Sequence, residues 1–469
     1  MTTTLGARIV VAGVSSGVGK TTVATGLMAA LRARGMKVAS AKVGPDFIDP
    51  GYHSLATGRP GRNLDSWICG EPAIPALAGR AASGADILVV EGVMGLFDGA
   101  ADGKPEATTA SIARLLDAPV LLVVDASAMS GSVAALVHGY STFDASIRVA
   151  GVVLNRIGSL RHETLLREAL QPLGVPVLGA LHLDGSFTWR DRHLGLVPVV
   201  EDAKGISHSI ARLAGEVTAS LDLNTIVETA RTAPTWHVEA PPTPRRVGEA
   251  RLAIAAGPAF SFVYQDNLEA LEAAGAELMP FDPRHESSLP KGSTALYAGG
   301  GFPEVFVAEL SENHPLQQDL REKAANGLVI WAECGGLLWL GRSLDGHPLT
   351  GLVPTEGTMT DRLTLGYRTA QCRVNCPLGS AGETLRGHEF HYSTVTPVGS
   401  ALTLRSRAGE SSAGFATAQL FASYLHLHLG NDALRAERFV SAATVTHRSP
   451  PREAALPHDG QPDHLSDSS

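Results

Sequence analysis

A glycine-rich loop near the start of the chain constrains its fold more than any other segment. The loop reads GVSSGVGKTT from Gly13 to Thr22, between an apolar run at Ala7–Ala12 and a helical pattern from Lys20 to about Arg34. Glycines let the backbone N–H groups point at phosphate oxygens, and the helix N-terminus favours an anion. A glycine-rich turn without a ligand has a similar composition. The order of strand, Gly-Lys-Thr-Thr string and helix favours a phosphate-binding loop.

Within the loop, side chains and backbone groups have distinct predicted roles. Lys20 is placed to reach the terminal phosphates of a nucleotide, and the Thr21 hydroxyl is placed to bind magnesium. The strict pattern has four residues between its first glycine and the Gly-Lys pair. This loop has five, and it resembles the loops of dethiobiotin synthetase type. We therefore expect ATP as a co-substrate and Mg²⁺ as a cofactor, with ATP contacts from Gly17, Gly19, Lys20, Thr21 and Thr22.

The rest of the first half alternates between apolar runs and helical patterns. This β-α alternation predicts a doubly wound parallel sheet, whose strands are buried on both faces. A net charge of -9 disfavours a nucleic-acid partner, because phosphate backbones attract basic surfaces. The further buried strands are predicted at Ala85–Val90, Val120–Asp125, Val149–Leu154 and Val175–Leu181.

A proline-rich segment divides the chain. Residues 232–248 read TAPTWHVEAPPTPRRVG and lack apolar periodicity, which is typical of a linker. Apolar strands and helical patterns resume with RLAIAA at Arg251–Ala256. We therefore predict an N-terminal P-loop domain at residues 1–231 and a second α/β domain at 249–449. The polar stretch 450–469 is predicted to be disordered.

The chain has four cysteines, and no apolar run reaches the roughly 20 residues of a membrane span. No signal peptide is recognised at its start. These features predict a cytoplasmic, reducing location in which thiols stay free. Cys372 and Cys376 have no second Cys or His pair at metal-ligand spacing, and we interpret them as ordinary thiols.

Polar residues follow several predicted strands of the first half. Asp46 and Glu91 lie at the carboxyl ends of strands, where a parallel sheet opens onto its ligand crevice. Carboxylate oxygens suit magnesium, although either residue could equally be a solvated loop acid. Asn155 ends another strand. It either contacts the nucleotide base or holds a turn, and the spacing does not choose between them.

A cysteine in the second half has the surroundings of a nucleophile. Cys334 follows the apolar run LVIW and precedes Gly-Gly and a helical pattern, so a strand, a sharp turn and a helix are predicted. The Gly335 N–H could stabilise an oxyanion. A second donor could come from Gly300 or Gly301, in the loop GGGFPE. A buried structural cysteine is the alternative.

A cysteine nucleophile needs a base, and the segment YLHLH offers His426 and His428. In a strand both histidines would lie on one face. A structural histidine is the alternative, but the position of this segment after the cysteine favours His426 as the base.

These segments together resemble the class I glutamine amidotransferases, which carry a G-x-C-x-G elbow and a later F-H-P-E-type motif. Aligning the second motif on LHLH places the catalytic histidine at His426 and puts His428 where a glutamate is usual. The chain thus departs from a Cys-His-Glu triad and is similar to the cobyric-type branch, which works with a Cys-His dyad. The resemblance implies a class I amidotransferase fold for the C-terminal domain.

Longer strings resemble the cobyrinic and hydrogenobyrinic acid a,c-diamide synthases, over about residues 7–445. One departure is the segment 255–264, AAGPAFSFVY, where the family usually has an acid near Gly257 and a second tyrosine at Val263. The strings that carry the resemblance are KVGPDFIDPGYH, NLD, EGVMGLFDG, RHLGLVP, GGGFPE, ECGG, LTLGYR and RGHEFHYS.

The resemblance implies an amidoligase of cobalamin biosynthesis. ATP would activate the a and c carboxylates of the ring as acyl phosphates, and ammonia from glutamine would displace phosphate. Cys334 would form the glutamyl thioester while His426 moves protons. Lys20, Thr21, Asp46 and Glu91 would hold magnesium-ATP. Further roles implied are charge stabilisation by Lys42 and substrate contacts by Tyr52, Asn63 and Asp65. The partners expected are the corrinoid precursor, glutamine and ATP, with no membrane and with a homodimer left open.

Three other hypotheses about the function stay open at this point. Cobyric acid synthases amidate other carboxylates of the ring, but they match KVGPDFIDPGYH and EGVMGLFDG less well. Nickel-sirohydrochlorin a,c-diamide synthases share many of the motifs. A P-loop ATPase switch with an inert amidotransferase-like domain is a different class, and an intact Cys334 and His426 argue against it. The sequence does not say whether the ring carries cobalt, or in which order the two amides form.

Overall fold

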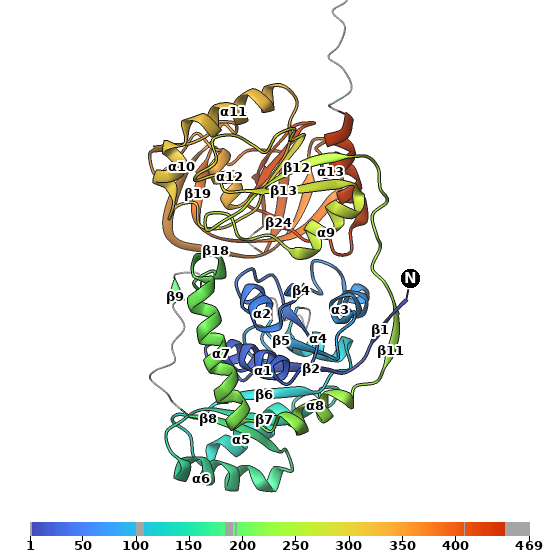
Figure 1. Cartoon of the computed structure of the whole chain (residues 1–469), viewed down its shortest axis with the longest axis vertical. Coiled ribbons are helices and arrows are strands. Elements are labelled where there is room, and N and C mark those ends of the chain that lie inside the picture. Colours follow the sequence, from blue (N-terminus) through green and yellow to red (C-terminus); the bar gives the residue numbers. More distant parts are fainter. Residues whose placement is uncertain (1, 100–106, 183–190, 193–194, 408, 446–469) are drawn as a thin grey trace, which may run out of the picture.

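The computed structural model describes residues 2–99, 107–182, 191–192, 195–407 and 409–445. It has two α/β domains, one above the other in Figure 1, joined by a long connection along one side. The predicted tail at 450–469 lies outside the described residues. No helix in the described ranges is both long and apolar enough to cross a bilayer.

The N-terminal domain is built on a seven-stranded parallel sheet of order β4-β3-β5-β2-β6-β7-β8. Two apolar cores cover its two faces, as expected for a doubly wound sheet. Most predicted strands lie within two residues of the observed ones. The strands are β2 Arg8–Gly13, β3 Val38–Val43, β4 Arg62–Leu64, β5 Ile87–Glu91, β6 Val120–Asp125, β7 Val149–Ile157 and β8 Val177–His182.

Helices on both sides enclose this sheet. Leu27 and Met28 of one helix pack with Ile210 and Leu213 of another on one face, while Leu77 and Ile112 pack on the other. One face carries α1 Lys20–Ala33, α2 Asp49–Thr57, α7 Ala203–Ser220 and α8 Leu223–Arg231, and the other carries α3 Ile74–Ala82, α4 Thr109–Leu115, α5 Ser132–Thr142 and α6 Leu160–Leu170.

The C-terminal domain has a six-stranded sheet of order β13-β12-β14-β15-β23-β22, parallel except for its last strand. Its helices include α9 Gln265–Ala274, α12 Gly335–Leu340 and α13 Ala433–Val445, with α10 Val307–Glu312 and α11 His314–Ala325 near its outer end (Figure 1). The strands are β12 Ala250–Ala255, β13 Ala276–Phe281, β14 Ala295–Ala298, β15 Val329–Glu333, β22 Phe415–Ala416 and β23 Leu420–Ser423.

A second sheet in this domain is mostly antiparallel and was not predicted. Its long hairpin pairs β18 (Glu356–Cys372) with β19 (Thr384–Thr396), and β24 (His426–Leu427) pairs with β19. Many residues of the hairpin alternate between buried and exposed positions, so it lacks the continuous apolar runs of the parallel strands. The hairpin places His388 opposite His426, the predicted base.

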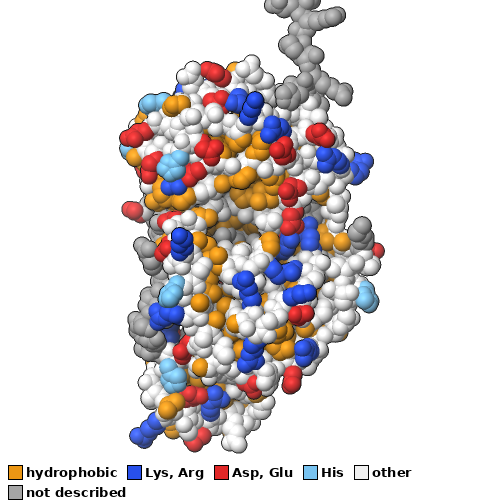
Figure 2. Space-filling view, in the orientation of Figure 1, with side chains coloured by type: hydrophobic (Ala, Val, Ile, Leu, Met, Phe, Trp, Pro, Cys, Tyr) orange, Lys and Arg blue, Asp and Glu red, His pale blue; other side chains and the backbone are white. Residues whose placement is uncertain are grey.

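The predicted linker at 232–248 is partly structured. Residues Trp236–Glu239 form β11, which pairs antiparallel with β1 (Thr2–Leu5). This ribbon lies against α3 of the N-terminal domain. The connection between the domains therefore packs on the first domain before the chain enters the second. Figure 2 shows the molecule hollowed where the domains meet, with apolar side chains along the hollow.

Candidate functional site

The phosphate-binding loop follows β2 and leads into α1. The Lys20 ammonium donates to the Ser15 carbonyl at 2.8 Å, so the lysine lies across its own loop. Burial and the nearby charge of Lys42 lower the pKa of Lys20 to about 8. A phosphate at this position would reverse that effect, because an opposite charge favours the protonated amine. The geometry fits an anion site.

Asn155 holds the loop rather than standing free at its edge. Its side-chain amide donates to the Val18 carbonyl at 2.8 Å. Gly19 has a positive φ of 93°, and a Cβ there would lie 2.2 Å from the Asn155 amide nitrogen. Glycine is therefore required at this position. In the described conformation Asn155 supports the loop backbone through this bond.

A buried charged cluster lies beside the loop and centres on Glu91, at the end of β5. Thr21 Oγ1 donates to Glu91 Oε1 at 2.6 Å, and Lys42 Nζ lies 2.8 Å from the same oxygen. The other carboxylate oxygen is 2.6 Å from His53 Nε2. Burial alone would raise the pKa of Glu91, but Lys42 and His53 outweigh it and hold that pKa well below its usual range.

Asp49 is a member of this cluster that sequence reasoning missed. Its carboxylate lies 2.6 Å from Lys42 Nζ and accepts from Thr21 at 3.4 Å. Burial and the negative charges of Asp46 and Glu91 raise the pKa of Asp49 well above its usual value. The second aspartate of the string GPDFIDP was the available signal, but its spacing alone does not separate it from the first.

Asp46 lies in the loop just before α2 and accepts the backbone N–H groups of Ile48 and Asp49, at 2.8 and 3.0 Å. It therefore orders the turn that presents Asp49. No group of three or more His, Cys, Asp or Glu side chains has metal-binding geometry within the described ranges. Magnesium usually keeps several waters and binds through one or two carboxylates plus phosphates. The excess negative charge around Asp49 fits such an ion.

The predicted substrate residues have other contacts in this conformation. The Tyr52 hydroxyl donates to the Val197 carbonyl at 2.8 Å in a buried position. Asn63 donates to the carbonyls of Gly44 and Asp46. Asp65 accepts from the Tyr367 hydroxyl of the C-terminal domain at 2.9 Å. Asn63 alone of the three also lines a cavity of about 160 Å³ between the domains.

The second centre is the turn at Cys334. This residue joins β15 to α12 with φ 49° and ψ −103°, a strained backbone conformation for a residue with a side chain. The turn places the thiol at a helix start, as the nucleophile-elbow pattern predicts. The side chain is buried, and its sulfur lies 3.9 Å from the Phe390 carbonyl oxygen.

The predicted oxyanion donors meet at this turn. A Cβ on Gly335 would lie 3.1 Å from the Gly301 nitrogen, so these two backbones are adjacent. The Gly300 N–H instead donates to the Phe262 carbonyl at 3.1 Å. A Cβ on Gly300 would lie 2.6 Å from His426 Cε1, so the histidine ring packs directly on this glycine. Of the two loop glycines, Gly301 is the better placed donor.

His426 has a carboxylate partner that the sequence analysis did not identify. Glu333 Oε2 lies 3.5 Å from His426 Nδ1, an ion-pair distance longer than an ordinary hydrogen bond. Burial opposes protonation of this histidine, but its contacts with Cys334 and Glu333 outweigh burial and raise the pKa of His426 to about 9. Glu333, directly before the cysteine, is thus the carboxylate beside His426, whereas the F-H-P-E-type alignment finds a histidine, His428, at the usual glutamate position.

Other contacts hold Glu333 in place. It accepts the Leu427 N–H at 2.9 Å and the Tyr297 hydroxyl at 3.1 Å, and it is fully buried. His428 contacts a different cluster, in which its ring lies 3.3 Å from Cys69 Sγ and 3.8 Å from Asp266. The only feature of the sequence that could have indicated a role for Glu333 is its place directly before the cysteine in ECGG. No general motif assigns a role to that position.

Phe47 connects the two centres and was also missed. Its ring lies 4.9 Å from the His426 ring and 5.7 Å from the His388 ring, between centroids. It belongs to the N-terminal domain and sits between Asp46 and Asp49 in the chain. An apolar residue of the loop before α2 therefore packs on His426 of the other domain.

Comparison with known proteins finds a family for each domain. Residues 9–197 match the CobQ/CobB/MinD/ParA nucleotide binding domain, and residues 251–434 match the CobB/CobQ-like glutamine amidotransferase domain. The hydrogenobyrinate a,c-diamide synthase of Streptomyces coelicolor is 47% identical, over 92% of this chain and 96% of that protein. The chain belongs to the a,c-diamide synthase family.

Two more a,c-diamide synthases are similar over nearly their whole length. The hydrogenobyrinate a,c-diamide synthase of Thermobifida fusca is 46% identical, over 93% of this chain and 97% of that protein. The cobyrinate a,c-diamide synthase of Syntrophotalea carbinolica is 43% identical, over 92% of this chain and 98% of that protein. The predicted fold of a P-loop domain followed by a glutamine amidotransferase domain is confirmed. The chain is a glutamine-hydrolysing amidoligase with a nucleotide-binding domain.

One prediction tests Glu333 directly. Replacing Glu333 with glutamine is expected to lower kcat/KM for glutamine hydrolysis by about 100-fold, because an uncharged amide no longer favours the protonated imidazole. The pKa of His426 then falls from its raised value of about 9, so the alkaline limb of the rate profile moves to lower pH. Glutamate release measured from pH 6 to 10 checks this. An unchanged limb would refute the role, and Glu312→Gln on the surface is the matched control.

Proposed function

We propose that this chain uses ATP and glutamine to convert the a and c carboxylates of hydrogenobyrinic or cobyrinic acid to amides, as a step of cobalamin biosynthesis. The observation that carries the proposal is the full-length similarity to a,c-diamide synthases, joined to an intact Cys334, His426 and Lys20. Relatives at 46–47% identity are named for the hydrogenobyrinate substrate and those at 40–43% for cobyrinate. That order favours the cobalt-free ring.

In the C-terminal domain, His426 takes the proton of the Cys334 thiol as the sulfur attacks the side-chain amide carbon of glutamine, and the carbonyl oxygen becomes an oxyanion held by the Gly335 and Gly301 N–H groups. His426 donates its proton to the departing ammonia, which leaves a glutamyl thioester. Water, deprotonated by His426, then hydrolyses the thioester to glutamate and restores the thiol. Glu333 orients the histidine and favours its protonated form throughout.

In the N-terminal domain, a ring carboxylate attacks the terminal phosphorus of ATP, giving an acyl phosphate and ADP. Lys20 and Lys42 would stabilise the charge on the transferring phosphoryl group. Mg²⁺, held by Thr21, Glu91 and Asp49 with the phosphates, would neutralise the phosphate oxygens when bound. Ammonia then attacks the acyl carbon and phosphate leaves, which forms the amide. Asp46 would order Asp49 through the backbone N–H groups of Ile48 and Asp49 rather than bind the ion itself.

Oxygen labelling tests the acyl phosphate. Ring substrate carrying ¹⁸O in its carboxylates is expected to transfer one label to inorganic phosphate for each amide formed, because the carboxylate oxygen departs with phosphorus. Mass spectrometry of the released phosphate measures this. Unlabelled phosphate alongside amide formation would contradict activation of the carboxylate by ATP.

A further inference from the structure

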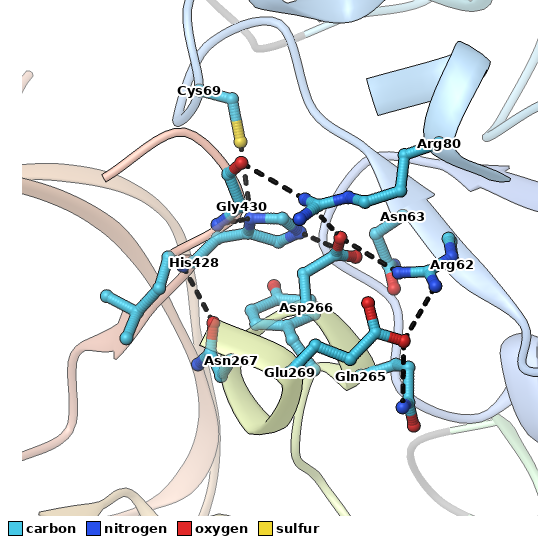
Figure 3. Close-up of polar contacts among 12 residues, drawn as sticks. Arg62, Asn63, Cys69, Arg80, Gln265, Asp266, Asn267, Glu269, His428 and Gly430 are labelled. Carbon is cyan, nitrogen blue, oxygen red and sulfur yellow. Dashed lines mark hydrogen bonds and ion pairs between the residues drawn. The ribbon is translucent and has the colours of Figure 1, made fainter. Parts of the chain in front are cut away.

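A buried ionic cluster joins the two domains (Figure 3). Asp266, in the first turn of α9, is 2% exposed. One of its oxygens lies 3.0 Å from Arg62 and 2.5 Å from Arg80, both in the N-terminal domain. Glu269, one turn later, lies 2.7 Å from Arg62. A single carboxylate on one domain thus binds two guanidinium groups on the other.

The next residue on α9 holds the segment that carries the general base. The Asn267 amide donates to the Leu427 carbonyl at 2.8 Å and its oxygen accepts the Leu429 N–H at 2.7 Å. These two contacts bracket His428, two residues beyond His426. The His428 ring in turn faces Asp266 at 3.8 Å, as Figure 3 shows. The first turn of α9 therefore touches the base-bearing segment on one side and the arginines on the other.

On the N-terminal side, Arg62 begins β4 and precedes Asn63. The Asn63 amide donates to the carbonyls of Gly44 and Asp46, at 2.9 and 2.7 Å. That loop continues through Phe47 to Asp49 in the nucleotide-side cluster. Arg80, on α3, also donates to the Gly430 carbonyl at 3.1 Å. The loop is thus linked through Asn63 and Arg62 to Asp266.

We propose that Asp266 is a positioning residue that couples glutamine hydrolysis to ring amidation, by fixing the base-bearing segment against the nucleotide-side loop. The inference rests on the proposed function. A buried ion pair contributes little net stability compared with an apolar contact, and its better attested use is to specify one arrangement. Two arginines on one domain bind one shared carboxylate on the other, so they favour a single position of one domain relative to the other. Ammonia released at Cys334 then reaches the acyl phosphate rather than solvent.

Replacing Asp266 with asparagine tests the coupling. The side chain keeps its size but loses the charge that holds Arg62 and Arg80. We expect the glutamate formed per ring amide to rise about fivefold or more over the wild-type ratio, while amidation driven by ammonium chloride proceeds at the wild-type rate. Glutamate and ring amides are measured in the same reaction. Asp266→Glu, which restores the charge, is expected to recover much of the coupling.

Two further variants keep the test decisive. Glu269→Gln removes only the outer contact with Arg62 and is expected to raise the ratio of glutamate to ring amide by a smaller factor. This variant replaces Asp266→Asn in the test if Asp266→Asn does not fold. Glu410→Gln, in an exposed pair with Arg405, is the matched control and should leave the ratio unchanged. A wild-type ratio in folded Asp266→Asn would overturn the inference. Failure of the wild-type enzyme to amidate the ring even with ammonia would instead overturn the proposed function.

Discussion

Replacing Cys334 with serine is expected to abolish amidation that uses glutamine, while amidation that uses ammonia continues. The oxygen nucleophile fits the same turn, but it is far less reactive than sulfur towards the amide of glutamine. The N-terminal domain retains its loop and charged cluster, so it still activates the ring. We expect glutamate release to fall by at least ~1,000-fold and the ammonia-dependent rate to change by less than about twofold.

The comparison requires glutamate release and ring amides to be followed with each nitrogen source. Cys376→Ser is a matched control, because Cys376 is a free, partly exposed thiol in the C-terminal domain. It should leave both activities intact. Sustained glutamine hydrolysis in Cys334→Ser would show that another group is the nucleophile. Loss of the ammonia-dependent reaction as well would show that the two centres cannot be separated in this way.

Replacing Glu91 with glutamine is expected to have the opposite pattern. ATP-dependent amidation should fall by about 100-fold with either nitrogen source, because Thr21, Lys42 and His53 lose their common carboxylate. Glutamine hydrolysis at Cys334 should persist. Removing one partner from a buried ion pair also costs about 3 kcal/mol of stability. Parallel assays of ADP, glutamate and amide formation, with a thermal melt, check these effects.

The stability part of this prediction depends on pH. The pKa of Glu91 is lowered in the folded protein, so its stabilisation is complete above the ordinary glutamate value of 4.5 and is lost as pH falls through the lowered value. The gap in melting temperature between wild type and Glu91→Gln should therefore be full at neutral pH and close only in strong acid. Glu168→Gln, on the exposed side of α6, is the control. A gap that stays constant down to strong acid would show that the Glu91 charge is not the cause.

The parts of the fold that could be predicted have strong local signals. The strand Val120–Asp125 was predicted with its observed bounds, because parallel strands buried on both faces are continuous apolar runs. The phosphate loop and the Cys334 turn were found because glycine, lysine and cysteine occur at fixed distances from a strand end. The hairpin of β18 and β19 was missed, since its many exposed positions give it no such run.

The site residues that were missed depend on contacts between distant parts of the chain. Glu333 gains its place from Leu427 and Tyr297, and the sequence shows only that it precedes Cys334. Phe47 looks like an ordinary apolar loop residue until the domains are placed together. Asn155 was left between two roles because strand ends in the sequence do not reveal which way a side chain turns; its bond to Val18 does.

Counting the amides on the product tests the central claim most directly. The purified chain is incubated with ATP, Mg²⁺, glutamine and either hydrogenobyrinic or cobyrinic acid, and the product is analysed by mass spectrometry with fragmentation to locate the amides. Two additions, at the a and c side chains, are the predicted result, with glutamate and ADP formed alongside. Four additions at other side chains, or none with either ring, would contradict the assignment of this chain as an a,c-diamide synthase.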